Sequence, residues 1–265
     1  EVRVRFSLHP PIFMEINKIN NLLELFYYQY LKQNKDDIFL ESLKEPRKKY
    51  SWEEVYLNII KLSKEISKYI NKSDRCLLIS ENRPEWLITD LSIMLSEGTT
   101  VPAYTTYTEK DYEYIINDCE PTLIFVSDKI QYEKIKDLIP KKKFIKQVIF
   151  FDPVDNIDIN LSQNINDIFK REYYENKIFF DLNIKRKDIA CIIYTSGTQG
   201  NPKGVMLSHG GILNNCEGSC DLLKSIISGR PRFLTWLPLS HSYEHTVQFV
   251  QIAVAAKVFY AESIE

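Results

Sequence analysis

The chain has 265 residues, of which 44% are hydrophobic and 26% charged, a composition typical of folded globular proteins rather than disordered ones. Its 34 basic and 36 acidic residues give a net charge of -2, so its charge does not favour nucleic acid as the main partner. The most apolar late stretch, Phe249 to Ala261, contains Gln251 and Lys257 and is far shorter than the roughly 20 apolar residues of a membrane-spanning helix. We therefore expect a folded protein without such a helix.

The cysteines are odd in number, and no two of them have C-x-x-C spacing: Cys76, Cys119, Cys191, Cys216 and Cys220. Cys216 and Cys220 lie one helical turn apart, but no convincing second pair of zinc ligands accompanies them. We therefore expect free thiols in a reducing compartment, no zinc site and a cytoplasmic location.

Residues 1–13 have no clear periodicity and no apolar core, so they do not resemble a signal peptide. A helical pattern begins directly after Met14, because apolar residues then recur three and four positions apart: Ile16, Ile19, Leu22, Leu23, Phe26 and Tyr30. We expect that Met14 is the natural start and that residues 1–13 are an upstream or non-native extension.

Further along the chain, helix signals alternate with strand signals. Three helices are predicted by their start signals: a capping box at Ser51 and Glu54 opening a helix to about Tyr69, Pro84 at a first helical position with Gly98 ending that helix, and Thr108 with Asp111. Short apolar runs predict strands at 75–80, 101–104, 123–126, 148–151, 189–194, 233–237 and 258–261. This alternation favours an α/β fold with mainly parallel sheets, in which the polar stretch 152–181 leaves the core.

The segment 194–205, YTSGTQGNPKGV, follows an apolar strand and carries the features of a phosphate-binding loop. Its three glycines let the backbone approach a ligand closely, so that successive N–H groups can converge on phosphate oxygens. Thr195, Ser196 and Thr198 add hydroxyl donors, and Lys203 adds a mobile positive charge suited to a terminal phosphate. The sequence therefore predicts a polyphosphate site.

The loop is not a Walker A motif, because Lys203 lies between Pro202 and Gly204 instead of preceding Ser or Thr. It resembles the signature loop of the adenylate-forming superfamily, which includes acyl-CoA synthetases, luciferases and peptide-synthetase adenylation domains. The usual pattern has a second Thr where Gln199 stands, a mild departure at one phosphate contact. Segments 80–104 and 107–127 resemble the same superfamily, and WLPLSHSYEHTVQ resembles its next motif, in the form typical of long-chain fatty acid–CoA ligases.

This resemblance, which runs from about Tyr50 to the last residue, implies a layered α/β/α fold. Residues 14–265 would then be the N-terminal portion of the large ATP/AMP-binding domain. The implied reaction has two halves: a carboxylate attacks the α-phosphorus of ATP to give acyl-AMP and pyrophosphate, and the thiol of coenzyme A then displaces AMP. Positioned donors and Mg²⁺ stabilise the charge that gathers on pyrophosphate.

By the same resemblance, the Thr198 hydroxyl reaches Mg²⁺, and the loop holds the β- and γ-phosphates through Thr195, Ser196, Gly197, Thr198, Gln199, Gly200, Lys203 and Gly204. His241, within PLSH, matches the position beside the acyl carboxylate and the α-phosphate, where it would be a neutral or cationic donor. His241 and Lys203 are therefore the predicted catalytic residues. We expect Tyr243, Glu244 and His245 to pack on a helix rather than to line an acyl tunnel.

The superfamily's adenine-binding motif, its ribose-binding acid and its C-terminal domain with the adenylation lysine are not found up to Glu265. We therefore expect these 265 residues alone to have little or no activity. We also expect them to aggregate readily, because sheet edges and apolar surface would remain uncovered.

The leading prediction is a long-chain fatty acid–CoA ligase that uses ATP, Mg²⁺ and coenzyme A. A fatty acyl-AMP ligase, which stops at the adenylate or passes it to a carrier protein, is a close alternative, and a peptide-synthetase adenylation domain is less favoured. The non-enzymatic alternative is a truncated remnant that binds nucleotide or a partner without turnover. Acyl chain length, oligomeric state and peripheral membrane contact stay open.

Overall fold

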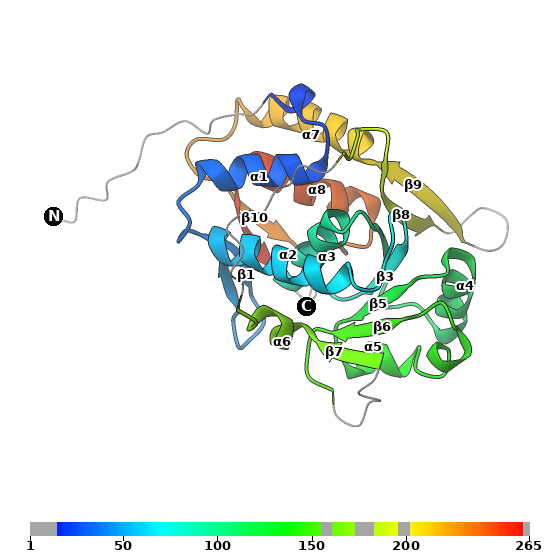
Figure 1. The fold of residues 1–265 in the computed structure, drawn as a ribbon. Helices are drawn as coiled ribbons and strands as arrows, with labels where there is room; N and C mark the ends of the chain where they lie inside the picture. The colour runs from blue at the N-terminus through cyan, green and yellow to red at the C-terminus, as the bar shows by residue number, and fades with distance from the viewer. Residues whose placement is uncertain (1–14, 155–160, 173–182, 196–201, 262–265) are drawn as a thin grey trace.

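The computed structural model describes residues 15–154, 161–172, 183–195 and 202–261, so the predicted extension at 1–13 lies outside the described residues. The described residues form two β-sheets with helices between and beside them (Figure 1). Apart from β1–β2 and β8–β9, every described strand pair is parallel. The predicted α/β fold with mainly parallel sheets is therefore confirmed.

The larger sheet has the strand order β7-β6-β5-β3-β4-β8-β9. Its strands are β3 (Arg75–Ile79), β4 (Thr99–Ala103), β5 (Leu123–Val126), β6 (Gln147–Phe150), β7 (Ser162–Asn164), β8 (Ile189–Thr195) and β9 (Lys203–Ser208). Successive β3 side chains alternate between two cores: Leu77 and Ile79 pack in the core that includes α4 (Glu109–Cys119), and Cys76 and Leu78 pack in the other. Ile139 of the 3₁₀ turn η2 (Ile139–Lys141) is buried in the same core as α4, and Tyr132 of helix α5 (Lys129–Glu133) packs against that core.

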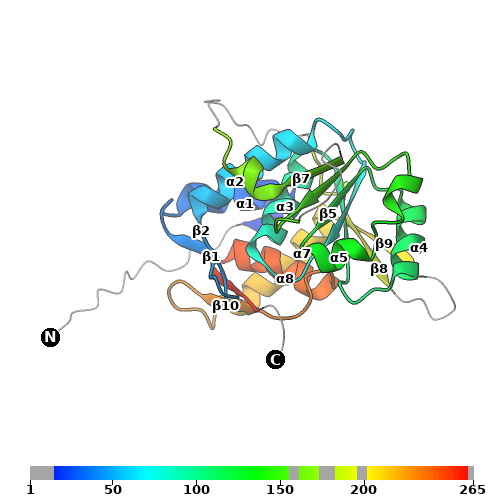
Figure 2. The same cartoon turned by 90° about the horizontal axis from the view of Figure 1, so that it is seen from below.

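The smaller sheet has the order β10-β11-β1-β2 and joins distant parts of the chain. Its strands are β1 (Ile38–Ser42), β2 (Lys49–Ser51), β10 (Arg232–Thr235) and β11 (Lys257–Tyr260). Figure 2 shows this sheet on the opposite side of the molecule from α4. The main helices of the shared core are α1 (Leu22–Lys32), α2 (Trp52–Ile66), α3 (Pro84–Leu95), α7 (His209–Leu223) and α8 (Ser242–Ala253).

Local start signals agree well with the structure. Both capping boxes, at Ser51 and at Thr108, are formed, and Pro84 is the first residue of α3. The continuous helix predicted from Met14 is wrong, because a 3₁₀ turn at Ile16–Lys18 comes first and the side chain of Asn21 then caps α1.

Gly98 has a different role from the predicted one. Helix α3 ends at Leu95, and the left-handed residue that follows is Glu97, with φ of 58°. A Cβ on Gly98 would lie 2.8 Å from the Ile70 Cδ1 atom and 3.3 Å from the Ile93 carbonyl oxygen, so close packing favours glycine at this position.

Within the predicted irregular stretch 152–181, the described residues include β7 and α6 (Ile165–Phe169), so that prediction is wrong there. The five cysteines are buried and unpaired. Burial raises the pKa of the Cys220 thiol to about 11, and it also raises the pKa of Cys76.

Candidate active site

Polar residues gather where the parallel strands of the larger sheet end. Strand β3 leads into the turn that carries Asn82, and β8 ends at Thr195, with β4 between them. Since neighbouring strands are about 4.8 Å apart, the ends of β3 and β8 lie roughly 10 Å from each other. This is the edge at which open α/β sheets bind their ligands.

The hairpin of β8 and β9 places two predicted site residues opposite each other. Antiparallel pairing sets Thr195 against Lys203 and Tyr194 against Gly204, so the Thr195 and Lys203 side chains share one face. Thr195, Lys203 and Gly204 are all exposed. The other predicted loop residues lie outside the described residues: Ser196, Gly197, Thr198, Gln199 and Gly200.

Gly204 is needed for packing within this hairpin. A Cβ there would lie 2.8 Å from the Ile192 Cγ2 atom and 3.3 Å from the Tyr194 ring. Tyr194 itself points to the other face, where its hydroxyl donates to Asp118 on α4. Tyr194 therefore fastens β8 to α4 and is not one of the hydroxyls available to a ligand beside Thr195.

His241 is the N-cap residue of α8, and its ring is exposed. Its Nδ1 atom accepts a hydrogen bond from the Tyr243 backbone N–H at 3.2 Å. An accepting Nδ1 carries no proton, so the neutral ring holds its proton on Nε2 and offers an N–H donor to solvent. The N-terminus of α8 adds a partial positive charge at the same place.

The residues after His241 differ in their surroundings. Tyr243 is 62% exposed, so the expectation that it packs against the helix is wrong. Glu244 and His245 are buried, as expected; burial raises the pKa of Glu244 to about 6. His245 lies 2.8 Å from the Asp90 carboxylate on α3, and although burial alone would lower the pKa of His245, Asp90 and the Cys191 sulfur raise it.

Asn82 connects the end of β3 to the segment that carries His241. Its Nδ2 donates to the Leu237 carbonyl at 2.8 Å, and its Oδ1 accepts from the Leu239 N–H at 3.0 Å. The sequence analysis did not single out Asn82, although it lies within the quoted segment SENRPEW. This contact ties the segment that leads to His241 to the end of β3, at the same edge of the larger sheet where β8 ends at Thr195.

The model of the family described as AMP-binding enzyme matches residues 28–265. The chain belongs to the AMP-binding enzyme family. The predicted resemblance to adenylate-forming enzymes is therefore confirmed. Among curated relatives, long chain acyl-CoA synthetase 3 of Arabidopsis thaliana is 30% identical over 222 residues, which are 79% of this chain and 33% of that protein. The chain thus spans about a third of the length of the curated relatives it matches.

Solved structures show the same fold. A red-emitting luciferase from Phrixothrix hirtus matches with a TM-score of 0.79 at 20% identity, over 93% of this chain and 47% of the luciferase. The N-terminal domain of FACL13 from Mycobacterium tuberculosis matches with a TM-score of 0.77 at 15% identity, over 93% of this chain and 58% of that one. The predicted fold, that of the N-terminal domain of adenylate-forming enzymes, is confirmed.

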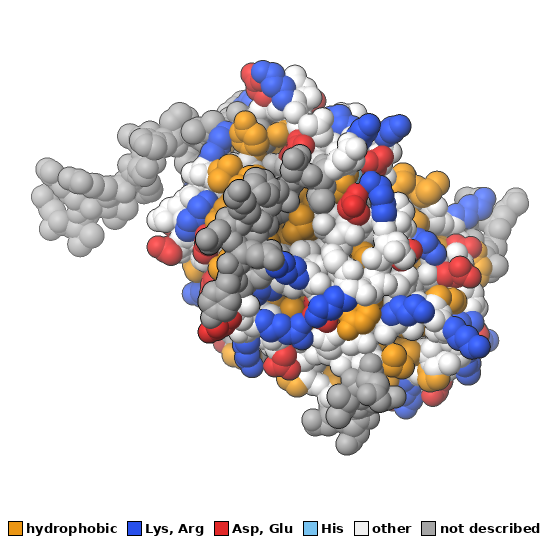
Figure 3. All heavy atoms as spheres, in the orientation of Figure 1, with side chains coloured by type: hydrophobic (Ala, Val, Ile, Leu, Met, Phe, Trp, Pro, Cys, Tyr) orange, Lys and Arg blue, Asp and Glu red, His pale blue; other side chains and the backbone are white. Residues whose placement is uncertain are grey.

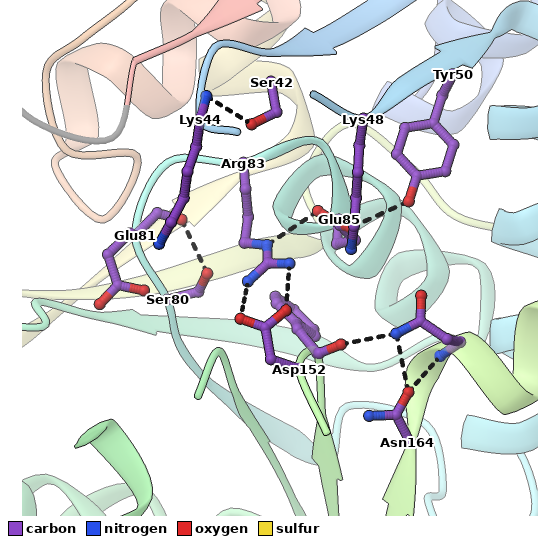
Figure 4. Close-up of polar contacts among 12 residues, drawn as sticks. Ser42, Lys44, Lys48, Tyr50, Ser80, Glu81, Arg83, Glu85, Asp152 and Asn164 are labelled. Carbon is purple, nitrogen blue, oxygen red and sulfur yellow. Dashed lines mark hydrogen bonds and ion pairs between the residues drawn. The ribbon is translucent and has the colours of Figure 1, made fainter. Parts of the chain in front are cut away.

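A second polar region of this family member, the Arg83 network, begins at the residue after Asn82 and is drawn in Figure 4. Arg83 donates to Glu85 at 2.9 Å and, through both terminal nitrogens, to Asp152 at 3.0 and 2.8 Å. Lys48 and Tyr50 also donate to Glu85, at 2.7 and 3.0 Å. Glu85 is fully buried; burial alone would raise its pKa, but Arg83 and Lys48 lower it to about 2.

The Arg83 network joins the two sheets. Tyr50 belongs to β2 of the smaller sheet, Glu85 to the first turn of α3, and Asp152 follows β6 of the larger sheet. A cavity of about 290 Å³ lies beside it and is lined by charges of both signs, Lys44 and Glu81 among them. Because the central charges already pair with one another, we assign this region to stability rather than to ligand binding.

The outer surface indicates the location of a functional site less specifically than the edge of the larger sheet does. On the face drawn in Figure 3, Lys and Arg side chains are interspersed with Asp and Glu, and hydrophobic side chains lie in separate patches. No helix among the described residues has the length and apolar character needed to cross a membrane. The case for a functional site therefore rests on the strand ends.

Proposed function

We propose that this family member activates a long-chain fatty acid in two steps, first to acyl-AMP with release of pyrophosphate and then to acyl-CoA. The observation that carries the proposal is the β8–β9 register, which pairs Lys203 with Thr195 where the two strands meet the signature loop. The names of the curated relatives support the substrate class. In this proposal, residues 14–265 are the N-terminal portion of the ATP/AMP-binding domain.

In the first step, a carboxylate oxygen of the fatty acid forms a bond to the α-phosphorus, and the bond from the α-phosphorus to the bridging oxygen of pyrophosphate breaks. Negative charge accumulates on the leaving pyrophosphate. Lys203 is exposed at the start of β9 and has no ion-pair partner among the described residues, so its charge is available to stabilise that leaving group. The remaining loop residues would donate backbone N–H groups to the same phosphates.

His241 supplies the second group of this mechanism. With Nδ1 accepting from the helix backbone, the Nε2–H can donate to the acyl carboxylate or to an α-phosphate oxygen. The N-terminus of α8 favours negative charge at that position. His241 therefore orients the two reacting groups and stabilises the charge between them without giving up its proton.

Mg²⁺ is compatible with the donors of this site. It usually binds few protein oxygens together with substrate phosphates, so it does not require a cluster of carboxylates. The described residues contain no group of three or more His, Cys, Asp or Glu that could hold a metal. We propose Thr198 as its hydroxyl ligand, and the bound ion would neutralise charge on the phosphates.

Fatty-acid-dependent release of pyrophosphate from ATP, measured on the complete gene product with and without coenzyme A, tests the proposal. We expect release that proceeds to a thioester only when coenzyme A is present. Release without any thioester would support the alternative, a fatty acyl-AMP ligase. No release with any fatty acid would contradict both activities and would indicate either a different carboxylate substrate or the non-catalytic remnant.

A further inference from the structure

Asn82 is placed to control the position of His241. Its side-chain amide contacts the two peptide groups on either side of Pro238, accepting from one and donating to the other. The contact joins residues 155 and 157 positions apart in the chain. Asn82 is only 8% exposed, so both hydrogen bonds are largely shielded from water.

The path from Asn82 to His241 is short and stiff. The Leu239 N–H, which donates to the Asn82 Oδ1 atom, belongs to the same planar peptide group as the Pro238 carbonyl. That carbonyl accepts the His241 N–H at 2.9 Å, and the His241 carbonyl accepts the first N–H of the helical ladder, from His245, at 3.0 Å. A shift of Asn82 would therefore move the N-cap residue of α8 directly.

Asn82 is itself held from both sides. The preceding residue, Glu81, accepts a hydrogen bond from Gln131 at 3.0 Å. The following residue, Arg83, is fixed by its bonds to Glu85 and Asp152 (Figure 4). A side chain anchored in this way can transmit a fixed position to a neighbour.

We infer that Asn82 is a positioning residue for the adenylation step, which holds the Leu237–Leu239 backbone so that the His241 Nε2–H is directed at the reacting groups. This inference rests on the proposed function. A misplacement of about 1 Å at a reacting group can lower a rate by about a hundredfold, so loss of this clamp should act on catalysis more than on binding. His241 supplies the interaction, and Asn82 acts through it.

The test compares Asn82→Asp with Asn166→Asp in the complete gene product. Asp keeps the shape of Asn but replaces the Nδ2 donor by an oxygen that repels the facing carbonyl. Asn166 offers a matched control, because its Nδ2 also donates to a backbone carbonyl, that of Phe151 after β6 at 2.9 Å, and not to the segment that leads to His241. We expect Asn82→Asp to lower kcat for pyrophosphate release by about 10–100-fold, with the KM for ATP within about twofold, and Asn166→Asp to leave both within about twofold.

A double-mutant cycle with His241→Ala separates positioning from a general structural role. If Asn82 acts through His241, Asn82→Asp lowers kcat by less than about twofold when His241 is already alanine. An equal loss in both backgrounds would overturn the inference. If Asn82→Asp lowers the Tm more than Asn166→Asp does, Asn82→Ser, which can keep only one of the two hydrogen bonds, replaces it in the same cycle.

Failure of the proposed function is distinguishable from failure of this inference. If the unmodified protein releases no pyrophosphate with any fatty acid, the proposed function has failed. Hydrogen exchange at the Leu239 and His241 amides then decides the positioning claim alone. Faster exchange by about tenfold in Asn82→Ala, which removes both hydrogen bonds, and not in Asn166→Ala, supports it, whereas unchanged exchange overturns it.

Discussion

The two polar regions at the edge of the larger sheet use charge in opposite ways. In the hairpin, Lys203 is exposed and has no ion-pair partner among the described residues. In the Arg83 network, Arg83 and Lys48 pair with Glu85 and Asp152 at distances of 2.7 to 3.0 Å (Figure 4). The two regions are close in the fold but do not compete for the same groups.

This difference shows which charges can serve a ligand. A charge that already has a partner offers little to a ligand, because the existing interaction must be broken first. An exposed ammonium without a partner costs little to redirect toward phosphate oxygens. We therefore expect changes in the Arg83 network to lower stability and changes in the hairpin to lower activity.

The largest expected effect follows from removing the buried carboxylate of the network. Glu85→Ala leaves Arg83 with one partner fewer and leaves Lys48 without an ion-pair partner among the described residues, so it should lower the free energy of unfolding by about 3–5 kcal/mol. Urea unfolding followed by circular dichroism measures the change. Glu45→Ala is the matched control, because Glu45 lines the same cavity but pairs on the surface with Arg47. A loss below about 1 kcal/mol for Glu85→Ala would mean that the network is not structural.

In the β8–β9 hairpin, a substitution should lower activity and leave stability nearly unchanged. Lys203→Met removes the charge but keeps the length of the side chain, and we expect kcat/KM for pyrophosphate release to fall by about 10²–10³-fold. The free energy of unfolding should change by less than about 0.5 kcal/mol, since Lys203 is exposed. Lys141→Met serves as the control, because Lys141 is also exposed but lies in η2, outside the β8–β9 hairpin. Equal losses of stability and activity in Lys203→Met would contradict the division between the two regions.

The sequence predicts best the features that depend on neighbouring residues. The capping box at Ser51 and the strand Leu123–Val126 were both predicted, because side-chain type and spacing within a few residues determine them. Strands β1, β2 and β9 were missed: β1 pairs with the distant β11, whereas β2 and β9 pair with β1 and β8, the strands just before them in the chain. β-structure of this kind is specified by context more than by local preference.

The same limit applies to the site. Thr195 and Lys203 were predicted as site residues because the signature loop carries them, and in the structure they are paired across the β8–β9 hairpin. Asn82 was not found, because its partners are more than 150 residues away and no local pattern marks them. An acidic residue such as Glu85 is common in the first turn of a helix, where it interacts favourably with the helix dipole. The neighbouring sequence does not indicate that Glu85 is fully buried.

Lowering the pH should reduce the stability that the Arg83 network contributes, by somewhat less than the loss expected for Glu85→Ala. The pKa of Glu85 is lowered to about 2 from an ordinary value of 4.5, so its contribution is complete above the ordinary pKa and is lost as the pH falls toward 2. A shift of this size corresponds to about 3 kcal/mol. Urea unfolding at several pH values should show the stability advantage of the unmodified protein over Glu85→Gln shrinking by that amount between about pH 5 and pH 2.

The comparison of Glu85→Gln with the unmodified protein removes the contributions of other carboxylates. The pKa values of Glu41 and Glu65 are also lowered; burial opposes the shift in both, and neighbouring cations cause it. These groups are present in both proteins, so their effects cancel in the difference. A stability difference that stays constant with pH would show that Glu85 is not held ionised by Arg83 and Lys48.

The smallest expected effect comes from the one neutral member of the network. The Tyr50 hydroxyl donates to the Glu85 carboxylate at 3.0 Å, and burial raises the pKa of Tyr50, so this hydroxyl stays protonated and keeps donating. Tyr50→Phe removes that donor but keeps the ring, while Lys48 still contacts the same carboxylate oxygen. We therefore expect a loss of only about 1 kcal/mol in the free energy of unfolding, measured by urea titration against Tyr28→Phe, whose ring is 51% exposed. A loss as large as that of Glu85→Ala would mean that the hydroxyl, and not the ion pairs, holds β2 against α3.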